Sequence, residues 1–150
     1  MALLAEAAKR RTPVYCLGAA PGVAEQAIRN VEKKVGSLVV VGTHSGFFDD
    51  REEARIIDAI AQSGAKLVLV ALGVPKQEKW ISQKLAHLDG VVAIGIGGSF
   101  DVMAGVVKRA PLWMQRNRIE WLYRLAKQPQ RILRMLALPR FMWAVLTAKK

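Results

Sequence analysis

Cysteine and histidine are scarce in this sequence. It has one cysteine, Cys16, and two histidines, His44 and His87, which lie far apart in the chain. A single cysteine excludes an internal disulfide and is typical of a protein kept in a reducing compartment. No zinc-binding set can be assembled from these residues. Because Cys16 lies within an apolar run, we expect it to be a small buried hydrophobic residue.

Long apolar runs are also absent, although 52% of the residues are hydrophobic. No run reaches the roughly 18 apolar residues that a membrane span requires. The first 12 residues are too charged and too short to be a signal peptide. A chain of 150 residues is long enough to bury a hydrophobic core, so the sequence predicts a globular protein.

Several motifs of nucleotide chemistry are missing as well. There is no GxxxxGK[ST] phosphate loop, and GxGxxG fails because Phe100 stands at the third glycine position. There is no Asp-x-Asp pair, since Asp49 and Asp50 are adjacent and are expected to begin a helix. A phosphorylated ligand would therefore be neutralised by Lys, Arg and backbone N–H groups, with no bound metal.

Acidic residues are nearly absent from the last part of the chain. Residues 1–107 contain 12 basic and 11 acidic side chains, whereas residues 108–150 contain 11 basic side chains and one acidic one. This asymmetry indicates a polyanionic partner, which is a nucleic acid, an anionic membrane surface or a phosphorylated ligand. A nucleic-acid binder would show interleaved aromatics on a sheet face or a recognition helix. The sequence shows neither, so we expect no nucleic-acid partner.

What the sequence does contain is an alternation of apolar runs and helical patterns. The runs cover residues 14–17, 38–41, 66–72 and 91–96, and glycines lie at or near the end of each. Helical patterns cover residues 22–35, 50–63 and 75–88. This order predicts an α/β fold in which a parallel sheet is built with right-handed crossovers and flanked by helices.

The carboxyl ends of parallel strands lie at one edge of the sheet, and ligands bind there. The predicted edge therefore carries residues 18–22, 43–46, 73–78 and 97–101. Asp101 is the one obvious carboxylate expected at this edge. It has two possible roles, which are to accept hydrogen bonds from ribose or sugar hydroxyls or to cap a helix.

After Pro111 the pattern is helical only, over residues 112–128, 130–138 and 140–150. We therefore expect an α/β domain over residues 1–111 and a basic helical appendage over residues 112–150. One interpretation is an amphipathic tail that lies on an anionic membrane. The other is a helical pair that packs on the sheet and leaves its basic face in solvent. The all-round apolar stretch 141–146 favours the membrane.

Five motifs occur together in this chain: Gly73-Val-Pro-Lys-Gln-Glu78, Gly97-Gly-Ser-Phe-Asp101, Gly105, Lys108-Arg-Ala-Pro111 and Glu120-Trp-Leu-Tyr-Arg124. In combination they resemble the WecG/TagA/CpsF family of bacterial glycosyltransferases, over residues 3–140. The resemblance implies a Rossmann-like α/β fold and an inverting transferase that needs no metal and no other cofactor. It also implies a cytoplasmic protein that is peripheral on the inner face of the plasma membrane.

The reaction implied by the resemblance is a sugar transfer. An N-acetylmannosamine-type sugar, either N-acetylmannosaminuronic acid or N-acetylmannosamine, would move from a UDP donor to polyprenyl-diphosphate-linked N-acetylglucosamine. Such steps belong to the synthesis of enterobacterial common antigen and of teichoic acid. The expected partners are the UDP-sugar, the lipid-linked acceptor and an anionic membrane surface, and a homo-oligomer is also possible.

The resemblance also implies roles for single residues. Gln77 would face the donor or acceptor at the reaction centre, Asp101 and the Gly97–Gly98 turn would hold the nucleotide sugar, and Phe47 would lie near the nucleotide. The alternative for Gln77 is an exposed residue at a helix start, and its neighbour Glu78 is expected to point in another direction. The full set expected to bind substrate is Gly18, Gly46, Phe47, Gly73, Pro75, Lys76, Gln77, Glu78, Gly97, Gly98, Phe100 and Asp101. The set expected at the acceptor diphosphate and membrane is Lys108, Arg109, Arg124, Arg131 and Arg134.

One departure from the family is large. Family members carry further residues before the point that matches the start of this chain, and the aspartate proposed as catalytic base belongs to an Asp-Gly motif there. We therefore expect the base, and part of the acceptor pocket, to lie in that preceding part. The alternative function, from a different class, is a non-catalytic UDP-sugar-binding or interaction module that has kept the fold and lost the chemistry.

Overall fold

The computed structural model describes residues 1–107 and residue 117. The helices predicted after Pro111, and the predicted domain boundary, lie outside the described residues. Within residues 1–107, ten elements follow one another in the order α1 (Ala2–Arg10), β1 (Pro13–Gly18), α2 (Val23–Val35), β2 (Val39–His44), α3 (Asp50–Gln62), β3 (Leu67–Ala71), α4 (Lys76–Trp80), the π-helix η1 (Ile81–Leu85), β4 (Val92–Gly95) and α5 (Ser99–Ala104).

The four strands form one parallel sheet in the order β2-β1-β3-β4. The expectation of a parallel sheet with flanking helices is therefore confirmed. The central strand β3 is buried along its whole length, which explains its unbroken apolar sequence. At the edge of the sheet, β4 is only partly covered, and Val92 is one of its exposed residues.

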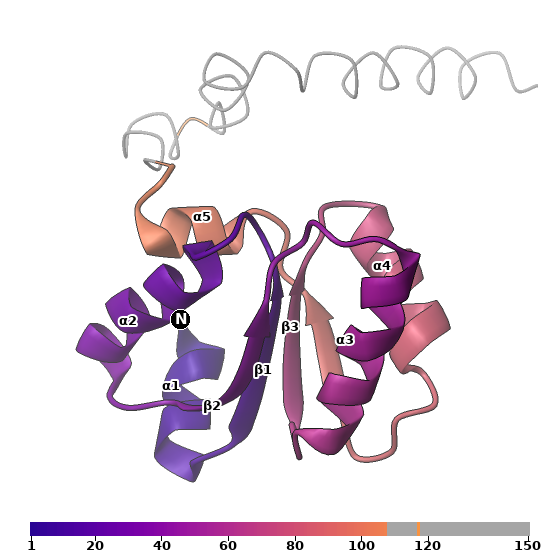
Figure 1. Cartoon of the computed structure of the whole chain (residues 1–150). Helices are drawn as coiled ribbons and strands as arrows, with labels where there is room; N and C mark the ends of the chain where they lie inside the picture. The colour runs from indigo at the N-terminus through magenta and orange to yellow at the C-terminus, as the bar shows by residue number, and fades with distance from the viewer. Residues whose placement is uncertain (108–116, 118–150) are drawn as a thin grey trace, which may run out of the picture. The chain divides into compact units, whose positions relative to one another are not determined.

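Helices cover both faces of the sheet, with α1, α2 and α5 on one face and α3 and α4 on the other (Figure 1). Strand residues alternate between the two cores. Val14 and Cys16 of β1 face α1, α2 and α5, whereas Tyr15 and Leu17 face α3, α4 and η1. This alternation follows from the two-residue period of a strand.

Two helix ends illustrate how local sequence determines the boundaries. The side chain of Asp49 accepts hydrogen bonds from the backbone N–H groups of Arg51 and Glu52, at 2.9 and 2.8 Å, and so caps α3. The prediction that Asp49 begins a helix is confirmed. The pattern over residues 75–88 forms no single helix, because α4 ends at Trp80 and continues as the π-helix η1.

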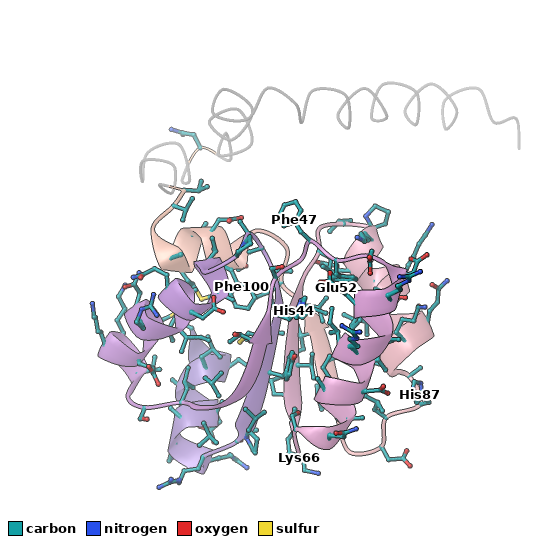
Figure 2. All side chains as sticks on the ribbon, viewed as in Figure 1. His44, Phe47, Glu52, Lys66, His87 and Phe100 are labelled. Atoms are coloured by element: carbon teal, nitrogen blue, oxygen red, sulfur yellow. The ribbon has the colours of Figure 1, made fainter. Side chains whose placement is uncertain are left out.

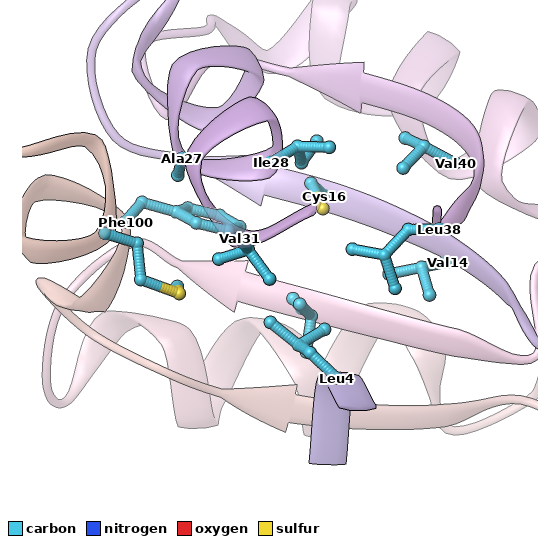
Figure 3. Close-up of a pocket in the computed structure, with 11 residues that line it drawn as sticks. Leu4, Val14, Cys16, Ala27, Ile28, Val31, Leu38, Val40 and Phe100 are labelled. Atoms are coloured by element: carbon cyan, nitrogen blue, oxygen red, sulfur yellow. The ribbon is translucent and has the colours of Figure 1, made fainter. Parts of the chain in front are cut away.

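A narrow apolar cavity lies in the core between α1, α2 and α5 and the sheet (Figure 3). Its lining includes Leu4, Cys16, Val31 and Phe100. The cavity lies inside the core and has no polar lining residue, so it is a packing defect and not a candidate site.

Cys16 is 1% exposed, and the prediction that it is a buried hydrophobic residue is confirmed. Burial, with the nearby charge of Glu25, raises the pKa of the Cys16 thiol to about 12. In an unfolded chain the pKa of a cysteine thiol is about 8.5. The folded chain therefore favours the neutral thiol. As the pH rises from about 8.5 toward the folded pKa, the thiol ionises in the unfolded chain first, and the free energy of unfolding falls.

We expect the wild-type chain to lose more unfolding free energy between pH 8 and pH 10 than the Cys16→Ala variant loses. Urea denaturation at the two pH values measures both losses. Burial and the neighbouring Cys16 charge also raise the pKa of Tyr15, so the difference between the two proteins reports the thiol together with its coupling to Tyr15. Equal losses in the two proteins would show that the Cys16 thiol ionises alike in the folded and unfolded chains.

Candidate functional site

The carboxyl ends of all four strands lie at one edge of the sheet, as parallel pairing requires. Leu17 pairs with His44, Gly18 with Ala71, and Val70 with Gly95. The segments predicted to share an edge therefore follow strands that end side by side. We call residues 18–22, 43–48, 72–78 and 95–101 together the carboxyl edge.

The strand order places a topological switch point between β1 and β3. The chain leaves β1 toward β2 on one side and later crosses to β3 on the other. The crevice outside such a switch point is where ligands bind in open α/β sheets. Gly18, Gly46 and Gly73 follow or end the three strands around it.

Three loops meet at the end of β1. Gly18 has φ 125°, and an added Cβ would lie 2.4 Å from the carbonyl oxygen of Ala71. The backbone N–H of Ala19 donates to that same oxygen at 3.1 Å, and the N–H of Gly46 donates to the oxygen of Ala19 at 2.8 Å. Only glycine fits this close approach of β1 to β3.

Phe47 follows Gly46 and is 73% exposed. Figure 2 shows its ring projecting from the carboxyl edge. An exposed aromatic ring beside a ligand edge offers a flat apolar surface on which a base can stack. Pro75, Lys76 and Glu78 are exposed as well. The Lys76 Nζ lies 5.3 Å from the centroid of the Phe48 ring, in a cation–π arrangement.

Gln77 is 3% exposed, so the alternative of an exposed residue at a helix start is wrong. Its Oε1 accepts a hydrogen bond from the backbone N–H of Gly97 at 2.9 Å. Its Nε2 donates to the carboxylate of Glu78 at 2.8 Å. An added Cβ at Gly95 would lie 2.5 Å from that Nε2. The side chain therefore joins α4 to the turn between β4 and α5.

The contact between Gln77 and Glu78 corrects a second expectation. Adjacent helix residues were expected to point in different directions, but here the two side chains are hydrogen bonded. Gln77 belongs to the first turn of a five-residue helix, where the long side chains of neighbours can bend toward each other. The exposed carboxylate of Glu78 is thus held next to the buried amide.

Phe100 corresponds to an expected substrate-binding position, but its side chain is 1% exposed and belongs to the core under α2 and α5. Its ring therefore cannot touch a ligand at the carboxyl edge. Phe100 is the second residue of α5, in its first turn, and its side chain points into the core (Figure 2). The Gly97–Gly98 turn precedes this helix, with Gly97 at φ 53° and Gly98 as the N-cap residue.

Asp101 lies in the first turn of α5 and is half-buried. The cap of α5 is Gly98, with no side-chain cap hydrogen bond, so the alternative that Asp101 caps the helix is wrong. Its carboxylate has no hydrogen-bond partner recorded in the described part of the chain. A carboxylate with unused acceptor sites at this edge is suited to sugar or ribose hydroxyls.

For UDP, the ligand that the motif resemblance implies, we expect Asp101→Asn to weaken binding about tenfold or more, the size of a lost charge-assisted hydrogen bond, and to change the unfolding midpoint little. Titration calorimetry and thermal melts on the same samples measure both quantities. The matched control is Asp58→Asn, the same change at an exposed position of α3. Unchanged affinity together with a large drop in melting temperature would make Asp101 a structural residue.

Glu25 is a carboxylate at the same edge that the sequence interpretation missed. It lies in the first turn of α2, and the hydroxyl of Thr43 donates to its Oε1 at 2.7 Å. That hydrogen bond, with the backbone N–H of Glu25 itself, holds the pKa of the Glu25 carboxyl below its ordinary value. The signal was available, because Glu25 follows the Gly18–Gly22 turn by three residues at the start of a predicted helix.

A third carboxylate, Glu53, has a structural role beside the site. Its Oε1 accepts from the Trp80 indole N–H and its Oε2 pairs with Lys84, both at 2.7 Å. The Lys84 contact is the main reason that the pKa of Glu53 is lowered. Glu53 thus fastens α3 to α4 and η1.

The remaining predicted positions lie outside the described residues; they are Lys108, Arg109, Arg124, Arg131 and Arg134. Within the described part, no group of His, Cys, Asp and Glu side chains is arranged to hold a metal ion. No helix there has the length and the apolar character that crossing a membrane requires.

A four-stranded parallel sheet flanked by helices, with glycine turns and an exposed aromatic ring at its carboxyl edge, defines an α/β protein of the doubly wound class. The model of the glycosyl transferase WecG/TagA/CpsF family matches residues 1–150. The chain belongs to this family, and the resemblance of its motifs is confirmed.

Two curated relatives carry the same name, N-acetylglucosaminyldiphosphoundecaprenol N-acetyl-beta-D-mannosaminyltransferase. The protein of Bacillus subtilis (strain 168) is 37% identical over 148 residues, which are 99% of this chain and 57% of the relative. That of Bacillus spizizenii is 41% identical over 145 residues, 96% of this chain and 55% of the relative. The chain spans about half the length of the curated relatives it matches.

Proposed function

We propose that this chain binds a UDP-sugar at the carboxyl edge and serves as the donor-binding part of an inverting glycosyltransferase. The sugar would be N-acetylmannosamine or N-acetylmannosaminuronic acid, and the acceptor a polyprenyl-diphosphate-linked N-acetylglucosamine. The main support is the family membership, together with the meeting of the predicted motifs at one edge beside the switch point. The names of the two Bacillus relatives support the sugar and the acceptor.

The proposed roles at the edge follow from the chemistry of the side chains. The exposed ring of Phe47 stacks on the uracil, and the carboxylate of Asp101 accepts hydrogen bonds from donor hydroxyls. Backbone N–H groups of the glycine turns and the ammonium of Lys76 neutralise the diphosphate without a metal. Gln77 acts on the donor through the Gly97 turn that it holds.

The transfer itself forms a bond between an acceptor hydroxyl oxygen and the anomeric carbon, while the bond from that carbon to the UDP oxygen breaks. The hydroxyl proton passes to a general base, which typically accelerates such a step about 10²–10⁴-fold. We propose that the base is the aspartate of the Asp-Gly motif in the part of family members that precedes the match to this chain. The Asp89–Gly90 pair of this chain lies before β4, at the opposite end of the sheet from the carboxyl edge, and is not that motif. The second candidate function is a UDP-sugar-binding or interaction module without transferase activity.

One experiment separates the two functions. UDP affinity by calorimetry and sugar transfer to a synthetic lipid-linked N-acetylglucosamine are measured on the same sample, beside one of the longer Bacillus relatives. The transferase proposal expects UDP binding and transfer at least about 10²-fold slower than by the longer relative, restored by adding the preceding part of that relative. UDP binding without any restored transfer would favour the binding module. No UDP binding would overturn both.

We also propose that the basic C-terminal region, which lies outside the described residues, binds the inner face of the plasma membrane. Each Lys or Arg near an anionic leaflet contributes about 1 kcal/mol. We expect the chain to sediment with vesicles containing phosphatidylglycerol and to be partly released by high salt, because salt screens these contacts. Phosphatidylcholine vesicles are the control. Equal partitioning to both would show that charge does not drive the contact.

A further inference from the structure

His44 is the last residue of β2 and lies beside Leu17 of β1 in the sheet register. Its ring Nδ1 lies 2.9 Å from the carbonyl oxygen of Ser45. A carbonyl oxygen can only accept a hydrogen bond, so the Nδ1 must carry the proton. The ring also meets Phe48 edge to face, with centroids 6.1 Å apart. Two contacts therefore orient this imidazole at the carboxyl edge (Figure 2).

The other ring nitrogen remains available. In a neutral imidazole with its proton on Nδ1, the Nε2 has a free lone pair and accepts hydrogen bonds. No hydrogen bond of Nε2 is recorded in the described part of the chain, and no buried side-chain nitrogen or oxygen there lacks a partner. The Nε2 therefore keeps contact with solvent. It is an oriented, unused acceptor beside the turn that ends β1.

The position of His44 in the fold indicates which kind of ligand group could donate a hydrogen bond to Nε2. In dinucleotide-binding units built as strand, helix and strand, the turn between strand and helix holds the phosphates, and an acidic residue about 20 residues further on accepts a hydrogen bond from a ribose hydroxyl. Such a unit runs here from β1 through α2 to β2, with its turn at Gly18–Gly22 and its second strand ending at His44. No carboxylate ends β2, and the hydroxyl of Thr43 is already used by Glu25.

We propose that the Nε2 of His44 accepts a hydrogen bond from a ribose hydroxyl of the bound nucleoside diphosphate. This assignment rests on the proposed function, since it concerns the same carboxyl edge. It makes His44 a binding residue that positions the donor, with the Ser45 carbonyl selecting its tautomer.

Two variants of the full chain test the assignment. The amide of Asn reproduces the Nδ1 donor to Ser45 but has no group at the place of Nε2, whereas the longer Gln brings its amide oxygen there. We expect His44→Asn to weaken UDP binding about three- to tenfold, the net effect of one hydrogen bond, and His44→Gln to stay within about twofold of wild type. His87→Asn, at an exposed position away from this edge, is the control (Figure 2).

Ribose analogues locate the partner hydroxyl. For the wild type, either the 2′-deoxy or the 3′-deoxy form of UDP should bind about three- to tenfold more weakly than UDP, and His44→Asn should bind that analogue and UDP equally. Nitrogen-15 spectra of the ring should show the proton on Nδ1 and a shift of the Nε2 resonance on adding UDP. Both resonances are read from the wild-type chain, so this result does not depend on how the variants fold.

The outcomes distinguish this inference from the proposed function. If the wild-type chain binds UDP but His44→Asn binds it equally well, or both deoxy analogues bind as UDP does, the assignment of His44 is overturned and the proposed function stands. A proton found on Nε2 in the free chain would also overturn the assignment. If the wild type does not bind UDP, the proposed function fails and the His44 assignment fails with it.

Discussion

Replacing Gly18 by alanine is expected to lower the free energy of unfolding by about 3 kcal/mol or more. The added Cβ would lie 2.4, 2.5 and 2.7 Å from backbone atoms of Ala71, which cannot move without separating β1 from β3. The backbone of Gly18, with φ 125°, is also one that alanine rarely adopts. Because β1 and β3 are the two central strands, any shift disturbs the whole sheet.

Urea denaturation followed by circular dichroism measures this loss. The control is Gly22→Ala, four residues further along the same turn. Gly22 also has a positive φ, of 80°, but an added Cβ there meets nothing within 4 Å. It should cost only about 1 kcal/mol, from backbone strain. Equal losses in the two variants would mean that the contact with Ala71 contributes nothing and that backbone strain alone determines both.

Replacing Gln77 by alanine is expected to lower the free energy of unfolding by about 2–4 kcal/mol. The variant loses the hydrogen bond from the N–H of Gly97 to Gln77 Oε1 and leaves a cavity where the amide was buried. An exposed Gln77, which was the alternative interpretation of the sequence, would leave stability unchanged on substitution. The same variant should weaken UDP binding, because the Gly97 turn that precedes Asp101 loses its anchor.

A double-mutant cycle with Gly95→Ala makes this prediction specific. The Cβ added at Gly95 would lie 2.5 Å from the Gln77 Nε2, so Gly95→Ala should destabilise the wild type more than it destabilises Gln77→Ala. Urea melts of the four proteins give the coupling. Gln83→Ala, at an exposed position of η1, controls for losing an amide as such. Additive effects of the two substitutions would contradict the packing of Gln77 against Gly95.

Much of the fold was predictable because its signals are local. The apolar run of β3 carries no polar residue since both faces of that strand are covered, and the helical patterns of α2 and α3 appear near the predicted bounds. Asp49 caps α3 through contacts two and three residues away. The π-helix η1 was not predicted, because its sequence differs in no local signal from the α-helix that precedes it and the two differ in their backbone hydrogen bonding.

The site was predictable in its location and less so in its side chains. That four glycine-containing segments share one edge follows from parallel strands and needs no tertiary information. Whether Gln77 is exposed depends on Gly97, which is 20 residues away in the sequence. The Glu25–Thr43 contact joins residues 18 apart, on different elements. Local sequence periodicity gives no signal for contacts between such distant residues. The exposed alternative for Gln77 was therefore wrong, and the Glu25–Thr43 contact was missed.

By itself, the sequence determined the class of fold, the family and the sharing of one sheet edge by the glycine-containing segments, because these depend on the order of apolar runs and on short motifs. Only the tertiary structure decided which motif residues are accessible at that edge. It placed Phe100 in the core and buried Gln77 under the Gly97 turn, and within the described part of the chain it left Asp101, Phe47 and the Nε2 of His44 open at the edge. The reason is physical: burial and hydrogen bonding depend on which distant segments pack together, and that packing is decided by the sheet as a whole.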